Sequence, residues 1–128
     1  MSIELKLLVC AVALSVLQLV VAVLGTVSQA GMPWAVGNRD TAVDFTGWVG
    51  RAHRAHRNML ESLVLFAALV LVAHAAGRES AHTALGANIF IWARTAYAVI
   101  YLVGVPWLRT AAWATGLAGL ALIFLQLI

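Results

Sequence analysis

Residues 7–30 read LLVCAVALSVLQLVVAVLGTVSQA, a continuous stretch without a charged side chain. A helix needs about 20 mostly apolar residues to cross the hydrocarbon core of a bilayer, and this stretch is longer than that. It also exceeds the apolar segment of a secretory signal peptide, and Glu4 and Lys6 leave the preceding residues without a net positive charge. We therefore expect a retained membrane-spanning helix over residues 3–28.

The rest of the chain is equally apolar. Of its 128 residues, 63% are hydrophobic and 10% are charged, and the mean hydropathy is +0.96. A soluble domain of this size needs far more charge on its surface. Further apolar stretches predict spans over 45–76, 81–103 and 107–128, with a loop over 31–44. We expect an all-α integral membrane four-helix bundle that forms a single domain over residues 1–128.

The basic residues indicate the orientation of the chain in the membrane. The sequence pI is near 9.8, but only eight residues are Lys or Arg, so a nucleic-acid partner is not expected. Five of them gather on one side of the predicted membrane: Arg39, Arg51, Arg54, Arg57 and Arg109. The positive-inside rule makes that side cytoplasmic and places both termini outside. The lack of a C-terminal di-lysine tail favours a bacterial inner membrane.

The sequence gives no sign of a metal centre or of a protein-borne nucleophile. Cys10 is the single cysteine and lies within the first predicted span, which excludes a disulfide framework. His53 and His56 are three residues apart without a further ligand at a suitable spacing, so we expect interfacial polar residues and no metal. No Ser-His-Asp set, phosphate loop or dinucleotide fingerprint is present. If the chain is an enzyme, its nucleophile comes from a bound small molecule.

Polar side chains of the second predicted span share one helical face. The segment reads Arg51-Ala-His-Arg-Ala-His-Arg-Asn-Met-Leu-Glu61. The residues at spacing i, i+3, i+4 and i+7 are Arg54, Arg57, Asn58 and Glu61, and Arg51 extends their stripe by one turn. Snorkelling at the interface explains Arg51 well, but it explains the aligned residues less well.

The third predicted span carries a similar stripe, with Arg94, Tyr97 and Tyr101 at i, i+3 and i+7. A charge about thirteen residues into an apolar helix is costly in lipid, so Arg94 should face protein and find a partner. Glu61 is the carboxylate placed to reach it from a neighbouring span, and we predict a Glu61–Arg94 pair. Such a pair can fix helix register without taking part in catalysis. The combined set of arginines, asparagine and tyrosines suits a small anionic ligand.

The segment Arg54-Ala-His-Arg-Asn-Met-Leu-Glu61 resembles the second-helix signature of the MAPEG family, the membrane-associated proteins in eicosanoid and glutathione metabolism. Within the family, the likeness is to the membrane prostaglandin E synthase and the microsomal glutathione transferases. The stripe from Arg94 to Tyr101, followed by Arg109, resembles the family's third- and fourth-helix pattern. The resemblance implies a homotrimer of four-helix protomers among membrane lipids, with glutathione bound between neighbouring subunits near the cytoplasmic face.

The resemblance also implies roles for individual residues. Arg109 matches the arginine assigned to the glutathione sulfur, which would make it the catalytic residue. The residues that would bind glutathione are Arg54, Arg57, Asn58, Glu61, Arg94, Tyr97, Tyr101 and Thr110. Three features depart from the pattern. Residues 25–29 around Ser28 lack the first-helix arginine of the eicosanoid enzymes, and Trp113 replaces a tyrosine. The loop 37–40 lies outside the pattern, and Arg39 either replaces the missing cation or only anchors the loop.

The resemblance therefore implies a membrane glutathione transferase or peroxidase acting on hydrophobic electrophiles that partition from the bilayer. Ser28 and Trp113 leave open a non-catalytic lipid-binding or scaffold member of the same fold. A small multidrug transporter also has four short helices, but it would carry a buried acid midway along the first span. Here Glu4 stands at the start of that span.

Overall fold

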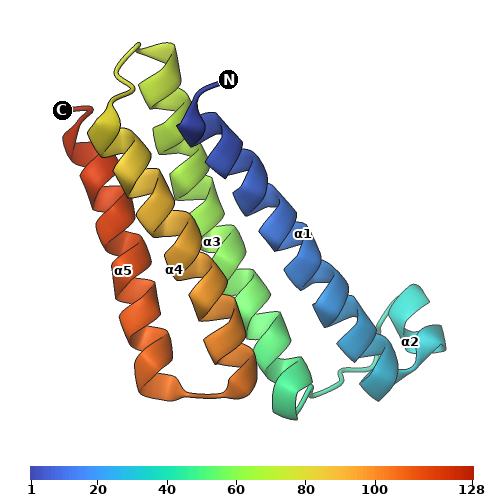
Figure 1. The fold of residues 1–128 in the computed structure, drawn as a ribbon. Coiled ribbons are helices and arrows are strands. Elements are labelled where there is room, and N and C mark those ends of the chain that lie inside the picture. The colour runs from blue at the N-terminus through green and yellow to red at the C-terminus, as the bar shows by residue number, and fades with distance from the viewer.

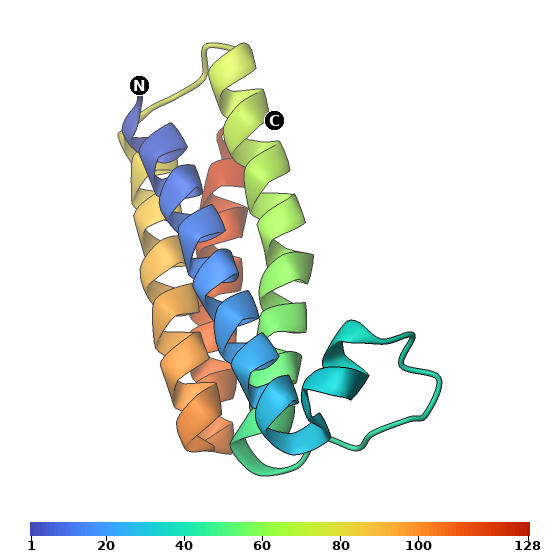
Figure 2. The ribbon, with the colours of Figure 1, turned by 90° about the vertical axis from the view of Figure 1, so that its right-hand side faces the viewer.

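The computed structural model describes residues 1–128, and its regular elements are all helices. The elements are α1 (Ile3–Ala30), α2 (Met32–Val36), α3 (Gly47–Ala75), α4 (Ala81–Val103) and α5 (Pro106–Leu125). The four long helices lie side by side as an antiparallel bundle (Figures 1 and 2). Both termini lie at one end of the bundle, and the α4–α5 turn and α2 lie at the other.

The four long helices are each long and apolar enough to cross a membrane. The chain is therefore an integral membrane protein. Their bounds closely overlap the predicted spans, and the largest difference is at the C-terminus, where α5 ends at Leu125. With 29 residues, α3 is about 43 Å long, whereas the hydrocarbon core is about 30 Å thick. Part of α3 must therefore project beyond the hydrocarbon core or tilt within it.

The region predicted as a loop over 31–44 begins with a short helix, α2. Pro33 lies in its first turn, where a missing N–H removes no intrahelical hydrogen bond. The helix ends at Val36, and the backbone N–H of Gly37 donates to the Pro33 carbonyl oxygen at 3.1 Å. Figure 2 shows α2 and the loop after it standing away from the end of the bundle.

Helices α4 and α5 pack through facing glycines. A Cβ atom on Gly86 would lie 2.7 Å from the carbonyl oxygen of Gly119, and one on Gly119 would lie 2.7 Å from the carbonyl oxygen of Gly86. Only residues without a side chain allow backbones to approach this closely. The turn between the helices contains Gly104, whose φ of 91° lies in the region that favours glycine, and Pro106 then begins α5. This close pairing fixes α5 beside the polar stripe of α4.

The core of the bundle is aromatic and aliphatic. Phe66 of α3 stacks on Phe90 of α4, with ring centroids 4.1 Å apart. The buried residues around this pair are Ala11, Met59, Val70, Ala87, Ile91, Leu120 and Ile123. Because these residues fill the half of the bundle nearer the termini, the polar side chains of α3 and α4 gather toward the opposite end.

Small residues of α1 form part of its contact with the other helices. Ala11, Ala22 and Gly25 are buried, whereas Ala13 is exposed. A Cβ atom on Gly25 would lie 2.9 Å from a methyl group of Val49. The close contact between α1 and α3 therefore depends on the missing side chain at Gly25.

Candidate functional site in a groove between α3, α4 and α5

Three adjoining hollows between α3, α4 and α5 form what we call the polar groove. The basic hollow, of about 190 Å³, is lined by Arg51, Arg54, Tyr101, Gly104, Val105, Pro106 and Arg109. The tyrosine hollow, of about 290 Å³, is lined by Asn58, Tyr97, Tyr101, Arg109, Thr110 and Trp113. The deep hollow, of about 130 Å³, is lined by Asn58, Glu61, Ser62, Leu65, Phe90, Arg94, Trp113, Gly116, Leu117 and Leu120. Shared residues make the three hollows one continuous groove.

Tyr101 lies at the centre of the groove between two arginines. Its hydroxyl oxygen accepts a hydrogen bond from Nε of Arg54 at 3.0 Å. The guanidinium carbon of Arg109 lies 4.7 Å from the centroid of the Tyr101 ring, within the range of a cation–π interaction. No protein acceptor takes the proton of the Tyr101 hydroxyl, so that proton is available to an anion in the groove. Tyr97 packs edge-on against Tyr101 at 5.5 Å.

Arg94 lies in the groove but does not form the predicted pair with Glu61. Its Nη2 donates to Oδ1 of Asn58 at 2.6 Å, and its guanidinium lies 4.5 Å from the centroid of the Tyr97 ring. Arg94 is 2% exposed, and its Nε is buried without a partner. Glu61 lines the same deep hollow and is itself exposed, but no ion pair joins it to Arg94. The guanidinium is therefore a buried positive charge whose protein partners are all neutral.

Helix α5 brings a third group of side chains to the groove from its first turns. Arg109 is half-buried and lines both the basic and the tyrosine hollows. Thr110 is exposed at the rim, and its hydroxyl donates to the Pro106 carbonyl oxygen at 3.2 Å. Trp113 lines the tyrosine and deep hollows where they meet. The groove therefore passes from a cationic end, near the α4–α5 turn, to an apolar end deep in the bundle.

The family model described as MAPEG family matches residues 6–128, almost the whole chain. The chain belongs to the MAPEG family. No curated protein and no solved structure matched it. The family match confirms the likeness that residues 54–61 and 94–109 suggested, and it agrees with an all-helical fold of four membrane-capable helices.

Eight of the nine residues that the MAPEG resemblance assigned to the site line the groove. They are Arg54, Asn58, Glu61, Arg94, Tyr97, Tyr101, Arg109 and Thr110. Arg57 is the exception, because it is exposed and lines none of the three hollows. It lies about 60° around α3 from Arg54, enough to turn it to the outside of the protomer.

Arg51 and Trp113 also line the groove, although neither was assigned to the site from the sequence. Arg51 reads as an interfacial residue, yet it lines the basic hollow, and its Nε donates to the Leu102 carbonyl oxygen at 3.1 Å. Because Arg51 lies one helical turn before Arg54, its spacing alone is enough to predict that it lies on the same face of α3. Trp113 reads only as a departure from the MAPEG pattern, yet it lines two of the hollows.

Arg39, the possible replacement for the missing first-helix cation, does not line the groove within this MAPEG protomer, and neither does Ser28. Arg39 donates from Nε and Nη2 to the Ala35 carbonyl oxygen, at 3.2 and 2.9 Å, and lies 5.2 Å from the centroid of the Trp34 ring. It therefore anchors the loop to α2. Ser28 is exposed on α1, where its hydroxyl donates to the Gly25 carbonyl oxygen at 2.7 Å.

His53 joins α3 to α1 and does not face the groove. Its Nε2 lies 2.8 Å from Oγ1 of Thr26, whose own proton goes to the Ala22 carbonyl oxygen. His53 is therefore the donor in this contact. Its ring stacks on Phe45 with centroids 4.5 Å apart. These contacts account for His53 as a structural residue that closes the α1–α3 interface.

Proposed function

We propose that this protein is a membrane glutathione transferase or peroxidase, which activates the glutathione thiolate for attack on hydrophobic electrophiles from the bilayer. The observation that carries the proposal is the charge of the polar groove. Four arginines line it, whereas Glu61 is its one carboxylate. Arg94 in particular is buried with a free Nε and without an acidic partner. Burial of an uncompensated charge is costly, so this site favours an anion that supplies the missing partner.

The donor set of the groove fits glutathione. Glutathione has two carboxylates, an amine and a thiol, and arginine side chains bind carboxylates with paired hydrogen bonds. In the proposal, Arg54, Arg94 and Asn58 hold its carboxylate and amide oxygens, and Glu61 receives its amine. The hydroxyl groups of Tyr97, Tyr101 and Thr110 offer further hydrogen bonds to the tripeptide. Arg57, which points away from the groove of its own protomer, contacts glutathione in the groove of a neighbouring subunit.

Arg109 is the proposed catalytic residue. When bound, glutathione supplies a sulfur nucleophile, which is reactive as the thiolate and not as the thiol. Each tenfold gain in the thiolate form requires ~1.4 kcal/mol of preferential stabilisation of the anion. The guanidinium of Arg109, placed beside the Tyr101 ring and partly shielded from water, can supply such stabilisation because charges interact strongly where water is scarce. The apolar part of the deep hollow, lined by Leu65, Phe90, Leu117 and Leu120, then offers a place for a hydrophobic electrophile.

We further propose that the groove is closed by a second copy of the chain in a homotrimer. Glu61 lies about 21 Å along α3 from Gly47, well inside the membrane, yet it is exposed in the protomer. A carboxylate facing lipid at that depth is costly, so protein must cover this face. The trimer itself follows from the MAPEG resemblance, and so does the placement of the site near the cytoplasmic face. In this orientation both termini lie outside, and the membrane is a bacterial inner membrane.

The test is the thermal stability of the detergent-solubilised protein with and without glutathione. We expect a glutathione-dependent increase in the melting temperature and glutathione-dependent turnover of an aromatic chloride or an organic hydroperoxide. Arg109→Ala should abolish turnover, because the thiolate loses its cation. Arg39→Ala is the matched control, since it removes an exposed arginine at the same end of the bundle but outside the groove. The absence of any effect of glutathione on the unmodified protein would contradict the proposal.

A second candidate is a non-catalytic lipid-binding or scaffold member of the family. Trp113 favours it, because this indole stands where the resemblance expects a tyrosine hydroxyl, and it joins the tyrosine hollow to the apolar deep hollow. A lipid tail could lie against that indole without any reaction. This candidate predicts that a fatty acid, and not glutathione, raises the melting temperature, and that Arg109→Ala has no effect on that increase.

A further inference from the structure

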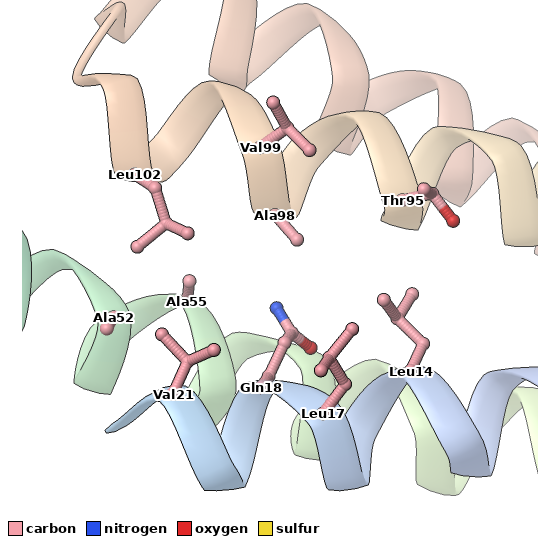
Figure 3. Close-up of a pocket in the computed structure, with 10 residues that line it drawn as sticks. All are labelled: Leu14, Leu17, Gln18, Val21, Ala52, Ala55, Thr95, Ala98, Val99 and Leu102. Carbon is pink, nitrogen blue, oxygen red and sulfur yellow. The ribbon is translucent and has the colours of Figure 1, made fainter. Parts of the chain in front are cut away.

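A second kind of hollow lies on the other side of α3 and α4, facing α1. Its volume is about 180 Å³, and eight of its ten lining residues are hydrophobic. The residues are Leu14, Leu17, Gln18, Val21, Ala52, Ala55, Thr95, Ala98, Val99 and Leu102 (Figure 3). None of them lines the polar groove. We call this space the α1 hollow.

Gln18 is the polar feature of the α1 hollow that packing does not explain. It stands about midway along α1, roughly 22 Å from Ile3, and is 9% exposed. Figure 3 shows its amide extending from α1 into the space in front of α4. Its Oε1 is fully buried and accepts no hydrogen bond. Buried polar atoms in proteins are nearly always paired, and an unpaired one in the middle of a membrane is a mark of function.

The opposite wall does not supply the missing donor. Thr95 is the other polar residue of the hollow, and its Oγ1 donates to the Ile91 carbonyl oxygen at 2.8 Å. Its single hydroxyl proton is therefore occupied, and only acceptor capacity remains. The α1 hollow thus presents two free acceptor atoms, Gln18 Oε1 and Thr95 Oγ1, among largely hydrocarbon walls, and the Gln18 amide also has N–H groups that make no hydrogen bond. A ligand hydroxyl can complete the site, because its proton satisfies Oε1 while its oxygen can accept from the amide.

The size and opening of the hollow indicate the kind of ligand. An engineered apolar cavity of about 150 Å³ holds benzene, so about 180 Å³ suits a single substituted ring. The alanines Ala52, Ala55 and Ala98 leave room for it between α3 and α4. Leu17 and Val99 line the hollow and are also 60% and 59% exposed, so the hollow opens toward the lipid. We propose that the α1 hollow binds a small, largely apolar molecule with one hydroxyl group, of the size of a phenol, which enters from the bilayer and donates to Gln18.

Two probes of the same shape test the proposal, 4-methylphenol and 1,4-dimethylbenzene, which differ by a hydroxyl in place of a methyl group. Binding to the full-length protein in detergent is read by competition against a photoreactive phenol, with the labelled peptides identified by mass spectrometry. We expect labelling in residues 14–21 or 95–102, and about fivefold stronger competition by the phenol than by the hydrocarbon, because one buried hydrogen bond is gained. Gln18→Leu should reduce this ratio to about one.

Gln126→Leu is the matched control, because it changes the same residue type at the end of α5, outside the hollow. It should keep the fivefold preference. Ala98→Leu, which fills the hollow, should remove the labelling altogether. Equal competition by the two probes in the unmodified protein, or a preference that survives in Gln18→Leu, would overturn the proposal. The glutathione response of Gln18→Leu should equal that of the unmodified protein, so failure here is distinguishable from failure of the proposed groove function.

Discussion

The two ends of the bundle are both polar, but they use their polar groups differently. At the end with the termini, acidic and hydroxyl side chains bond to one another and fasten the helices. At the end with the α4–α5 turn, arginines bond to neutral groups and retain free donors. Comparison of the two ends separates side chains that hold the fold from side chains that are free to bind a ligand.

At the terminal end, the hydrogen bonds join residues that are far apart in the sequence. The buried carboxylate of Glu4 on α1 accepts from Thr83 on α4 at 2.5 Å. Glu79, in the turn before α4, accepts from Ser2 at 2.5 Å and contacts His74 Nδ1 at 3.2 Å. These contacts tie the start of α1 to the α3–α4 turn. No side-chain polar atom of these residues is buried without a hydrogen-bond partner, so this end offers little to a ligand.

At the groove end, the arginine and tyrosine side chains keep hydrogen-bond donors that no protein group accepts from. Arg94 has an unpartnered Nε, and the Tyr101 hydroxyl accepts from Arg54 but donates to no protein group. These unused hydrogen-bonding groups do not stabilise the fold. A buried charge without an acidic partner lowers the free energy of unfolding relative to an apolar side chain of the same size. The difference between the ends therefore predicts opposite outcomes when a polar side chain is removed.

The largest effect on stability is expected for Thr83→Val at the terminal end. Thr83 is fully buried, bonds Glu4, and accepts from the Ser80 backbone N–H at 2.7 Å in the capping box of α4. Its loss leaves a buried carboxylate without a donor, which should lower the free energy of unfolding by about 2–3 kcal/mol. Unfolding in mixed detergent micelles measures the change.

Thr115→Val is the control for that measurement. The Thr115 hydroxyl donates only to the Ala111 carbonyl oxygen of its own helix, and the residue is exposed. This change should alter the free energy of unfolding by less than about 0.5 kcal/mol. Equal losses for the two variants would show that the Glu4–Thr83 bond does not fasten the end of the bundle.

Arg94→Met tests the other side of the comparison. The change keeps an unbranched side chain against Gly116 and removes a buried charge, so the free energy of unfolding should stay constant or increase by about 1 kcal/mol. Glutathione affinity should fall at least about tenfold, because a charged donor to the ligand is lost. Calorimetric titration and unfolding of the same sample separate the two effects.

Arg39→Met serves as the reference for Arg94→Met, because it removes an exposed arginine from the loop and should leave glutathione affinity unchanged. A loss of stability of 2 kcal/mol or more in Arg94→Met, with affinity retained, would make Arg94 a structural residue. The polar side chains at both ends of the bundle would then serve to stabilise the fold.

The sequence predicted the helices well because hydropathy and helix breakers determine them. The span over 81–103 agrees with α4 at both ends, where Ser80 caps the start and Gly104 ends the helix. Helix α2 escaped prediction because five residues between Gly31 and Gly37 are too few to show a helical period. The Gly86–Gly119 contact could not be predicted, since no local pattern specifies which glycines of two helices will face one another.

The site was predictable as a stripe but not as a set of contacts. Asn58 and Glu61 lie on the same face of α3, and charge alone favoured Glu61 as the partner of Arg94. In the structure, Arg94 instead donates a hydrogen bond to Asn58. Which side chains of two helices meet depends on the rotation and axial shift of the helices, and the residue spacing along one helix does not determine these. The same limit explains Arg57, whose spacing fits the stripe while its side chain lies outside the groove.

A smaller effect on binding is expected for Tyr101→Phe within the groove. The ring remains between Arg54 and Arg109, but the hydroxyl that accepts from Arg54 and can donate to an anion is lost. Glutathione affinity should fall about fivefold, the value of one neutral hydrogen bond, with little change in the melting temperature without ligand. An unchanged affinity would place the ligand away from Tyr101.

The smallest effect concerns pH at the terminal end, where hydrogen bonds from Ser2 and His74 lower the pKa of the Glu79 carboxyl below its ordinary value of 4.5. A carboxyl group with a lower pKa in the folded state adds stability above its unfolded pKa and loses it as the pH falls through its folded pKa. The melting temperature of Glu79→Gln should therefore be slightly below that of the unmodified protein at pH 7, and the difference should shrink below about pH 4.5. Asp44→Asn, which changes an exposed carboxylate without a hydrogen bond, should show no such trend. A difference that stays constant between pH 7 and pH 3 would mean that ionised Glu79 does not fasten the turn.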